Sequence, residues 1–275
     1  MTDSRRQWLM RAAQLSAMST LPRWAWSQNA RLQHNPFSLG IASGDPSPDG
    51  FVLWTRLMPT DAPPPGTALP PDILNLFGPQ TVRWEVAHDE QFKQIVARGT
   101  TEAVPDFAHS VHVEVRGLPP GRWFFYRFMH GDAVSAIGRT RTAPAANEMP
   151  ERLRVIYASC QRWEHGFYSA WRHAAAQSPD LVMFLGDYMY EYASPAKPDG
   201  LARVHKLHLP HTLADYRDRY ALHKSDPDLQ LAHTVAPWIV TWDDHEVQND
   251  YVGSWGKGGT SAEFLLSRTA AWQAF

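Results

Sequence analysis

The chain has 275 residues, a formal net charge of −2 at pH 7 and 44% hydrophobic residues. This length allows two domains with cores of ordinary size, and the composition excludes a largely disordered chain. A charge so close to zero gives no electrostatic reason to expect a specific nucleic acid or an anionic membrane as the main partner. The only cysteine, Cys160, excludes an internal disulfide, so it is either a core residue or a metal ligand.

The first thirty residues have the features of an export signal. Arg5 and Arg6 form a twin-arginine pattern, and a short, mildly apolar segment follows at 12–21. This segment is about half as long as a bilayer-spanning helix. We therefore expect residues 1–30 to be a twin-arginine signal peptide and not a stable membrane anchor, with a basic amphipathic helix as the alternative. The signal predicts the twin-arginine translocase as a partner during export and a periplasmic or secreted protein.

Residues 36–143 have the pattern of a β-sandwich domain. Short runs of aromatic and β-branched residues alternate with Gly, Pro and Asp clusters. Strands are expected at 37–43, 51–57, 81–88, 111–116, 123–130 and 134–141. The segment 118–128, in which Leu-Pro-Pro-Gly precedes alternating aromatic residues, resembles the later strands of a fibronectin type III or immunoglobulin-like sandwich. Residues 143–151 are the expected linker to a second domain.

From residue 152 the pattern changes to strands that alternate with helices. Strands are expected at 153–159, 181–185 and 237–242, and helices at 167–177, 212–222 and 261–275. The first strand, helix and second strand form a βαβ unit, which implies parallel strands and a right-handed crossover. In open α/β sheets the chemistry lies just beyond the carboxyl ends of such strands.

Each of these three strands ends in potential metal ligands. Cys160 follows the first strand, and Asp187 and Tyr190 follow the second. The third strand is followed by Asp243, Asp244, His245, Glu246, Asn249 and Asp250. Four carboxylates within eight positions repel one another unless a cation lies among them, so a metal is the simplest explanation. The structural alternative is a helix cap and turn with solvated charges.

These residue types suit a dinuclear phosphohydrolase, which needs a bridging carboxylate and ligands of different hardness. Asp187 is well placed as the bridge. Tyr190 could supply a phenolate, which only a strongly acidic cation such as ferric iron holds deprotonated near neutral pH, and Cys160 could supply a thiolate. His245 could stabilise charge on the phosphate or on its leaving group.

Two other segments are candidate binding sites for a metal or a nucleotide, on weaker grounds. His205, His208 and His211 have a spacing that could bind a metal on one helical turn, but Lys206 and Pro210 favour a solvated loop. The glycine-rich segment 249–259 lacks the Gly-Lys-Ser/Thr ending of a P-loop, which disfavours nucleotide binding.

The motifs resemble those of metallophosphoesterases. Gly186-Asp187-x-x-Tyr190 and Asp244-His245-Glu246 are similar to motifs of the calcineurin-like and purple-acid-phosphatase enzymes. The resemblance is closer to the PhoD-like alkaline phosphatase D family, which is sometimes described with phospholipase D activity. It rests on five segments in order: 40–46, 53–56, 158–161, 186–191 and 242–247. It implies a two-domain α+β fold, with a fibronectin III or immunoglobulin-like β-sandwich before a calcineurin-like αββα metallophosphatase sandwich.

The resemblance also implies a ferric ion with a calcium ion. Cys160, Asp187 and Tyr190 would bind iron, with Asp187 bridging to calcium. Asp244 and Asn249 would complete the calcium side, although the residues alone do not decide between Asp244 and its neighbour in the sequence. Zinc or manganese would also suit these ligands.

Two further residues have catalytic roles by the same resemblance. His245 would act on the phosphate, and Arg268 is similar to an arginine that contacts phosphate, with a solvated helix face as the alternative. The implied reaction is the hydrolysis of phosphomonoesters and phosphodiesters, in which a metal-bound hydroxide attacks phosphorus in line. The partners would be small phosphate esters or phosphodiesters.

Members of this family are considerably longer than 275 residues, and further metal ligands come from strands beyond that point. We therefore expect a C-terminally truncated chain, in which 152–275 is the N-terminal part of the metallophosphatase domain. Two functions stay open at this point. The first is an exported metal-dependent phosphoester hydrolase, and the second is an inactive fragment that acts at most as a binding domain.

Overall fold

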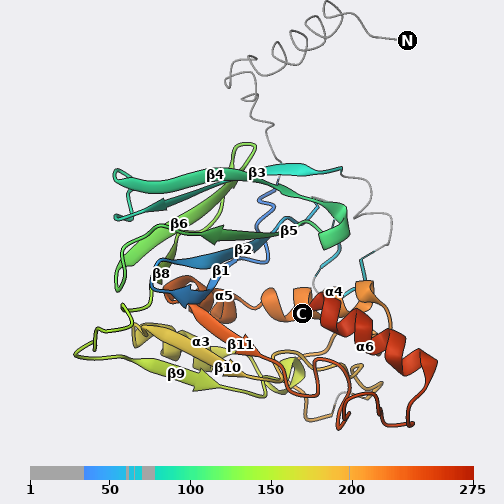
Figure 1. Cartoon of the computed structure of the whole chain (residues 1–275). Helices are drawn as coiled ribbons and strands as arrows, with labels where there is room; N and C mark the ends of the chain where they lie inside the picture. The colour runs from blue at the N-terminus through green and yellow to red at the C-terminus, as the bar shows by residue number, and fades with distance from the viewer. Residues whose placement is uncertain (1–33, 60–61, 65, 70–77, 198) are drawn as a thin grey trace, which may run out of the picture.

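The computed structural model describes residues 34–59, 62–64, 66–69, 78–197 and 199–275. The predicted signal peptide at 1–30 lies outside these residues. A β-rich half formed by the N-terminal residues lies above a half that contains the helices and three further strands (Figure 1). Within the described ranges, no helix combines the length and the apolar character that crossing a membrane requires.

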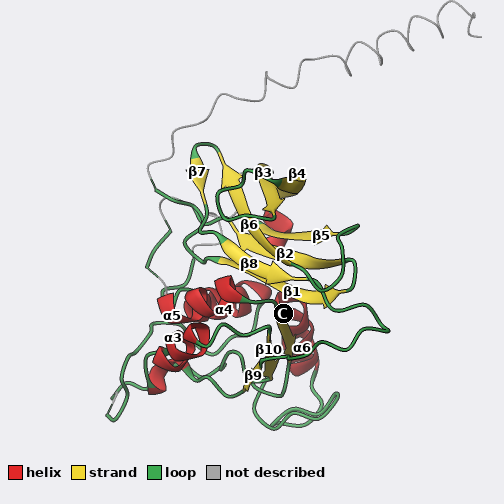
Figure 2. Ribbon diagram, turned by 90° about the vertical axis from the view of Figure 1, so that its left-hand side faces the viewer, coloured by secondary structure: helices red, strands yellow, loops and turns green. Residues whose placement is uncertain are grey.

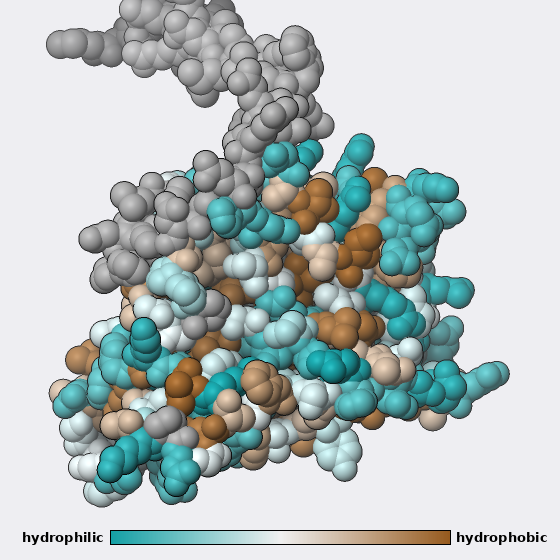
Figure 3. Space-filling model, turned by 180° about the vertical axis from the view of Figure 1, so that it is seen from behind, coloured by the Kyte–Doolittle hydropathy of each residue, from teal (hydrophilic) through white to brown (hydrophobic). Residues whose placement is uncertain are grey.

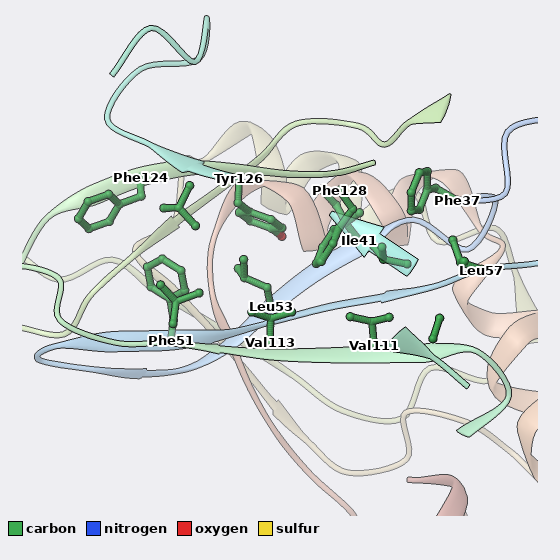
Figure 4. Packing of buried hydrophobic residues seen from close by; sticks show 14 of the residues in the cluster. Phe37, Ile41, Phe51, Leu53, Leu57, Val111, Val113, Phe124, Tyr126 and Phe128 are labelled. Atoms are coloured by element: carbon green, nitrogen blue, oxygen red, sulfur yellow. The ribbon is translucent and has the colours of Figure 1, made fainter. Parts of the chain in front are cut away.

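The β-rich half consists of two sheet layers around a shared core. Its strands are β1 (Ile41–Ser47), β2 (Gly50–Arg56), β3 (Gln80–Ala87), β4 (Ile95–Ala103), β5 (Ser110–Val115), β6 (Trp123–His130), β7 (Ala133–Val134) and β8 (Gly138–Arg141). One layer has the order β5-β2-β1, and the other has the order β4-β3-β6-β7 with β8 also paired to β6. Side chains such as Leu53, Val113 and Phe124 meet between the layers (Figure 4). Two layers on one core confirm a sheet-rich sandwich, whereas the fibronectin III or immunoglobulin-like topology stays a prediction.

Two local predictions for the β-rich half need correction. The strand β4 has no counterpart among the expected strands, because most of its side chains are exposed or half-exposed and its sequence lacks an apolar pattern. The strand expected at 134–141 is divided into β7 and β8, with Ser135 between them donating its hydroxyl to the carbonyl oxygen of Ala136. By contrast, Val111, Val113 and Val115 are buried as their alternation predicts.

The second half is built on three parallel strands. These are β9 (Val155–Ala158), β10 (Leu181–Leu185) and β11 (Trp238–Thr241), with β10 in the middle. The helices are α3 (Ser169–Ala176), α4 (Leu213–Lys224), α5 (Pro227–Val235) and α6 (Ala262–Ala274), with short 3-10 turns at Pro105–Phe107 and Trp163–His165. The helix α3 joins β9 to β10, which confirms the predicted βαβ unit, whereas α5 was not predicted.

The helices pack against the sheet through two clusters. The helices α3 and α5 contact β10 and β11 through a cluster that includes Trp171, Phe184, Leu229 and Trp238. The helices α4 and α6 pack against each other. In Figure 2 the labelled helices, drawn in red, lie below the strands of the β-rich half. Thr212 and Asp215 form the capping box that the sequence predicts at the start of α4. Hydrophilic and hydrophobic residues are interspersed on the face seen from behind (Figure 3).

The calcineurin-like αββα arrangement is not shown by the described residues. The surface of β9, β10 and β11 that faces away from α3 and α5 exposes apolar side chains, including Tyr157 at 75%, Leu185 at 47% and Ile239 at 40%. The described chain therefore contains one helical layer and one sheet of the four layers expected.

A single six-stranded sheet joins the two halves. The strand β1 pairs in parallel with β11 at Gly44 and Trp238, so the strand order is β5-β2-β1-β11-β10-β9. A Cβ atom at Gly44 would lie 2.8 Å from the carbonyl oxygen of Trp238. Only glycine allows the two backbones to approach so closely. The segments 36–143 and 152–275 thus share a continuous sheet although they have separate cores.

We expect Gly44→Ala to weaken this junction. The added methyl group has no room beside the backbone of β11, so the free energy of unfolding should fall by about 1–3 kcal/mol. Gly78→Ala is the matched control, because a Cβ atom there meets nothing within 4 Å. Chemical denaturation of both variants measures the effect, and equal stabilities would contradict this view of the junction.

His223 on α4 predicts a loss of stability in acid. Its side chain is buried, Nε2 has no hydrogen-bond partner in the described part of the chain, and burial lowers the pKa of the ring to about 3. The unfolded chain binds the proton near pH 6.5, so the free energy of unfolding should fall as the pH decreases from about 6.5 towards 3, by up to about 1.4 kcal/mol per pH unit. His223→Gln should flatten this slope in urea denaturation between pH 7 and 4. Parallel slopes for the two proteins would refute the assignment.

Candidate metal centre

The loops after β9, β10 and β11 meet at the carboxyl edge of the parallel strands. Asp187 follows β10 at φ 59° and is 6% exposed, and Gly186 before it has φ 104°. A Cβ atom at Gly186 would lie 2.5 Å from Cβ of Asp243, so a side chain there would separate the β10 and β11 loops. Cys160, at φ 59°, donates its backbone N–H to the carbonyl oxygen of Gly186 at 3.2 Å. This close packing turns Asp187 towards both neighbouring loops.

One oxygen of the Asp187 carboxylate faces the β9 loop. Cys160 Sγ lies 3.3 Å from Asp187 Oδ2, and the hydroxyl of Tyr190 donates to the same oxygen at 3.1 Å. Burial raises the pKa of Tyr190, and the charge of Asp187 raises it further. The three predicted iron ligands are therefore brought together by the fold, with the phenol protonated as the chain stands.

The other oxygen of Asp187 faces the β11 loop. The backbone N–H of His245 donates to Asp187 Oδ1 at 3.4 Å. One ligand atom from each of Asp187, Asp244 and His245 lies within 4.8 Å of the others, and this is the metal-type cluster found among the described residues. Asp244 belongs to this cluster and Asp243 does not, so the geometry favours Asp244 as the ligand.

Glu191 holds the His245 ring, a role that the sequence did not reveal. Glu191 Oε2 lies 2.8 Å from His245 Nδ1, and Glu191 Oε1 accepts the backbone N–H of Asn249 at 2.9 Å. The His245 ring also stacks on Tyr190 with 4.1 Å between the ring centroids. Burial alone would lower the pKa of His245, but the hydrogen bond and charge of Glu191 outweigh it and raise that pKa. A carboxylate behind a histidine in this way fixes the ring and leaves Nε2 available.

Glu246 is a second buried carboxylate that the sequence did not single out for a role. It is 1% exposed and accepts the backbone N–H groups of Tyr188 at 2.5 Å and Asp243 at 2.9 Å. Burial raises its pKa, while the backbone donors act in the opposite direction. Its carboxylate ties the loop after β10 to the loop after β11. The feature of the sequence that could have indicated this role is the position of Glu246, an acidic residue next to the predicted ligands.

Two predicted site residues have contacts outside the cluster. The Asn249 carboxamide donates to Asp250 Oδ2 at 2.5 Å. Arg268 on α6 donates to the carbonyl oxygen of Gly253, and its guanidinium lies 4.6 Å from the ring centroid of Trp272. The roles of Asn249 in calcium binding and of Arg268 in phosphate binding stay predictions.

The three histidines of the long loop do not come together as a metal site. His205 is buried, with Nε2 2.8 Å from Arg219 Nη1 and 3.3 Å from Glu164 Oε1. His208 has an exposed side chain that pairs with Asp215 at 3.1 Å. The expected solvated loop is thus correct for His208 and wrong for His205, which is a core residue because Arg219 and Glu164 satisfy its polar ring.

The fold and the cluster together define a class of protein. It is an α/β protein with a β-sandwich extension, in which the carboxyl ends of parallel strands bring acidic residues and a histidine to one candidate metal centre. Within this class, the protein is further characterised by the order of the loops along the chain: the one with Cys160, then the one with Asp187, then the one with Asp244 and His245.

Comparisons with known proteins identify the family. The model of the PhoD-like phosphatase N-terminal domain matches residues 23–144, and that of the PhoD-like phosphatase matches residues 155–275. Alkaline phosphatase D of Bacillus subtilis (strain 168) is 46% identical over 243 residues, which are 87% of this chain and 40% of that protein. A solved structure of PhoD superposes with a TM-score of 0.80 at 45% identity, covering 89% of this chain and 46% of that one. The chain belongs to the PhoD-like phosphatase family and spans less than half the length of these two relatives.

Replacing Glu246 tests the tie between the two loops. In Glu246→Gln the amide nitrogen can no longer accept a backbone N–H, so one buried donor loses its partner and the free energy of unfolding should fall by about 1–3 kcal/mol. Glu263→Gln, at an exposed position in the first turn of α6, is the control. Thermal and urea unfolding of the purified variants measure the difference. A stability equal to that of the control would contradict the role of Glu246.

Proposed function

We propose that this chain is a metal-dependent hydrolase of phosphomonoesters and phosphodiesters. The observation that carries the proposal is the position of Asp187, whose Oδ2 contacts Cys160 and Tyr190 and whose carboxylate also lies within 4.8 Å of potential ligand atoms of Asp244 and His245. A carboxylate in this position suits a bridge between two cations. The 46% identity to an alkaline phosphatase D supports the choice of phosphate esters as the substrate class.

The donor atoms fit the two ions differently. Cys160, Asp187 and Tyr190 offer sulfur, carboxylate and phenol oxygen, which suit ferric iron, because a strongly acidic cation displaces the phenol proton. Asp187, Asp244 and Asn249 offer oxygen atoms, which suit calcium. Zinc or manganese are the alternatives for the first set. When bound, such ions neutralise negative charge on a phosphate and make water more acidic.

Glu191 would orient the His245 ring whether the imidazole binds a metal or contacts the phosphate. Because Nδ1 is engaged by Glu191, Nε2 is the nitrogen available to a metal or to the phosphate. The raised pKa of His245 favours the protonated ring, which can donate to the leaving oxygen of an ester. Glu191 would keep that ring oriented while Tyr190 packs against its face.

The setting of this activity is also a proposal. The twin-arginine pattern at Arg5 and Arg6 supports export through the twin-arginine translocase to the periplasm or the medium. The reaction would then act on small phosphate esters outside the cytoplasm. The alternative, a chain that binds metal without turnover, is separated from hydrolysis by the following test.

Asp187→Asn should abolish activity with little change in fold. The protein is loaded with iron and calcium and assayed with nitrophenyl phosphate and with the bis-nitrophenyl diester. Because the amide loses the negative charge between the ions, turnover and metal content should fall by more than about 100-fold. Asp106→Asn, on an exposed turn of the β-rich half, is the control. Unchanged turnover in Asp187→Asn would exclude the bridging role.

A spectroscopic measurement separates iron binding from turnover. A tyrosinate bound to ferric iron gives a visible absorption band, which Tyr190→Phe should remove. A folded wild-type sample with neither the band nor turnover would overturn the hydrolase proposal for this chain. The band without turnover would support the alternative of a metal-binding chain.

A further inference from the structure

Arg162 lies at the start of the loop that carries Cys160. Its backbone is extended, at φ −65° and ψ 122°, immediately before the 3-10 turn Trp163–His165. Its side chain is 23% exposed. The nearest carboxylate is that of Glu164, with 3.6 Å between Arg162 Nε and Glu164 Oε2. That distance is an ion pair and is too long for a hydrogen bond.

The guanidinium of Arg162 is connected to the cluster through one aromatic ring. Its central carbon lies 5.0 Å from the ring centroid of Tyr192, and this ring meets the His245 ring edge-on at 5.3 Å. Arg162 and His245 therefore lie against the same aromatic ring.

Within the described residues the Arg162 guanidinium makes an ion pair with Glu164 but no hydrogen bond. Its Nε is buried without a hydrogen-bond partner there. Arg203 and Arg268 also have one buried nitrogen each without a partner, but their other donors are used: Arg203 donates to the carbonyl oxygen of Trp163 and to Asp226, and Arg268 donates to the carbonyl oxygen of Gly253. The two terminal nitrogens of Arg162 are not buried in this way, so their donors are open to an anionic ligand from the solvent side.

We propose that Arg162 binds the phosphoryl oxygens of the substrate beside the Asp187 cluster. This inference rests on the proposed function. A guanidinium presents planar, paired donors that match two oxygens of a phosphate, and a partly exposed arginine at the edge of a cluster can reach a ligand from the solvent side. Glu164 and the Tyr192 ring would hold the guanidinium in place.

The charge of the substrate decides how much Arg162 contributes. A phosphomonoester dianion presents more charge and more free oxygens than a diester monoanion. Arg162 should therefore favour monoesters over diesters, and its loss should raise KM for the monoester more than for the diester. Arg162 would thus be a residue that determines specificity within the proposed reaction.

The test uses the full chain loaded with iron and calcium. Arg162→Ala and Arg162→Lys are compared with Arg98→Ala, which removes an exposed arginine from β4 in the other sheet. Calorimetric titration with inorganic phosphate measures binding without turnover, and nitrophenyl phosphate gives KM and kcat. We expect about 10- to 100-fold weaker phosphate binding in Arg162→Ala, partial recovery in Arg162→Lys and no change in Arg98→Ala.

The outcomes separate this inference from the proposed function. Phosphate affinity that is unchanged in a folded Arg162→Ala protein with normal iron content would overturn the role of Arg162, even if the wild type hydrolyses esters. Wild-type chain that binds phosphate through Arg162 without turnover would retain the inference and refute the hydrolase. If Arg162→Ala does not fold, Arg162→Lys decides, because wild-type affinity and wild-type ester preference in that variant would contradict recognition by a paired guanidinium.

Discussion

The geometry of the candidate site depends on one buried carboxylate, that of Glu246. It accepts backbone N–H groups from Tyr188 and Asp243, one from each of the loops that follow β10 and β11. Buried backbone donors need acceptors, and here one side chain satisfies two loops at once. Asp187 lies directly before one of these donors and Asp244 directly after the other. The distance between the two potential ligands is therefore set by a residue that need not bind metal itself.

A second constraint comes from the backbone of the same loops. Asp187 and Cys160 both have positive φ, a conformation that costs non-glycine residues free energy and is commonly retained where function requires it. Gly186 lies so close to Asp243 that any side chain would force the loops apart. The positive φ angles and the close contact between Gly186 and Asp243 together hold Asp187 between the loop after β9 and the loop after β11.

The continuous sheet gives the β-rich half a structural role in the site. The strand β11 lies between β10 and β1, paired with β10 along its whole length and with β1 at its first residue, Trp238. The core around Leu53 and Phe124 is thereby connected to the start of β11 through the Gly44 junction, and the loop with Asp244 and His245 follows the other end of this strand, at Thr241. Around the cluster, Glu191 and Tyr190 restrict the His245 ring, and the guanidinium of Arg162 lies against the Tyr192 ring that meets it.

The sequence by itself determined the elements and the chemical types of the ligands. Alternating valines, the capping box at Thr212 and the apolar run before Asp187 are local signals, and each depends only on near neighbours. These signals were sufficient to predict the parallel strands, the grouping of Cys160 with Asp187, and the family. The edge strand β4 and the short helix α5 were not predicted, because the sequences of an exposed strand and of a nine-residue helix show little hydrophobic periodicity.

Only the tertiary structure decided which distant residues meet. The pairing of Gly44 with Trp238, the contact of Glu191 with His245 and the position of Arg162 beside Tyr192 join residues from different loops or strands. Such contacts depend on how whole elements pack, and neither composition nor spacing encodes them in a readable form. For the same reason His205, one of three histidines with equal spacing, proved to be a core residue. The function of a charged group or an imidazole depends on the residues around it, and the fold determines which residues those are.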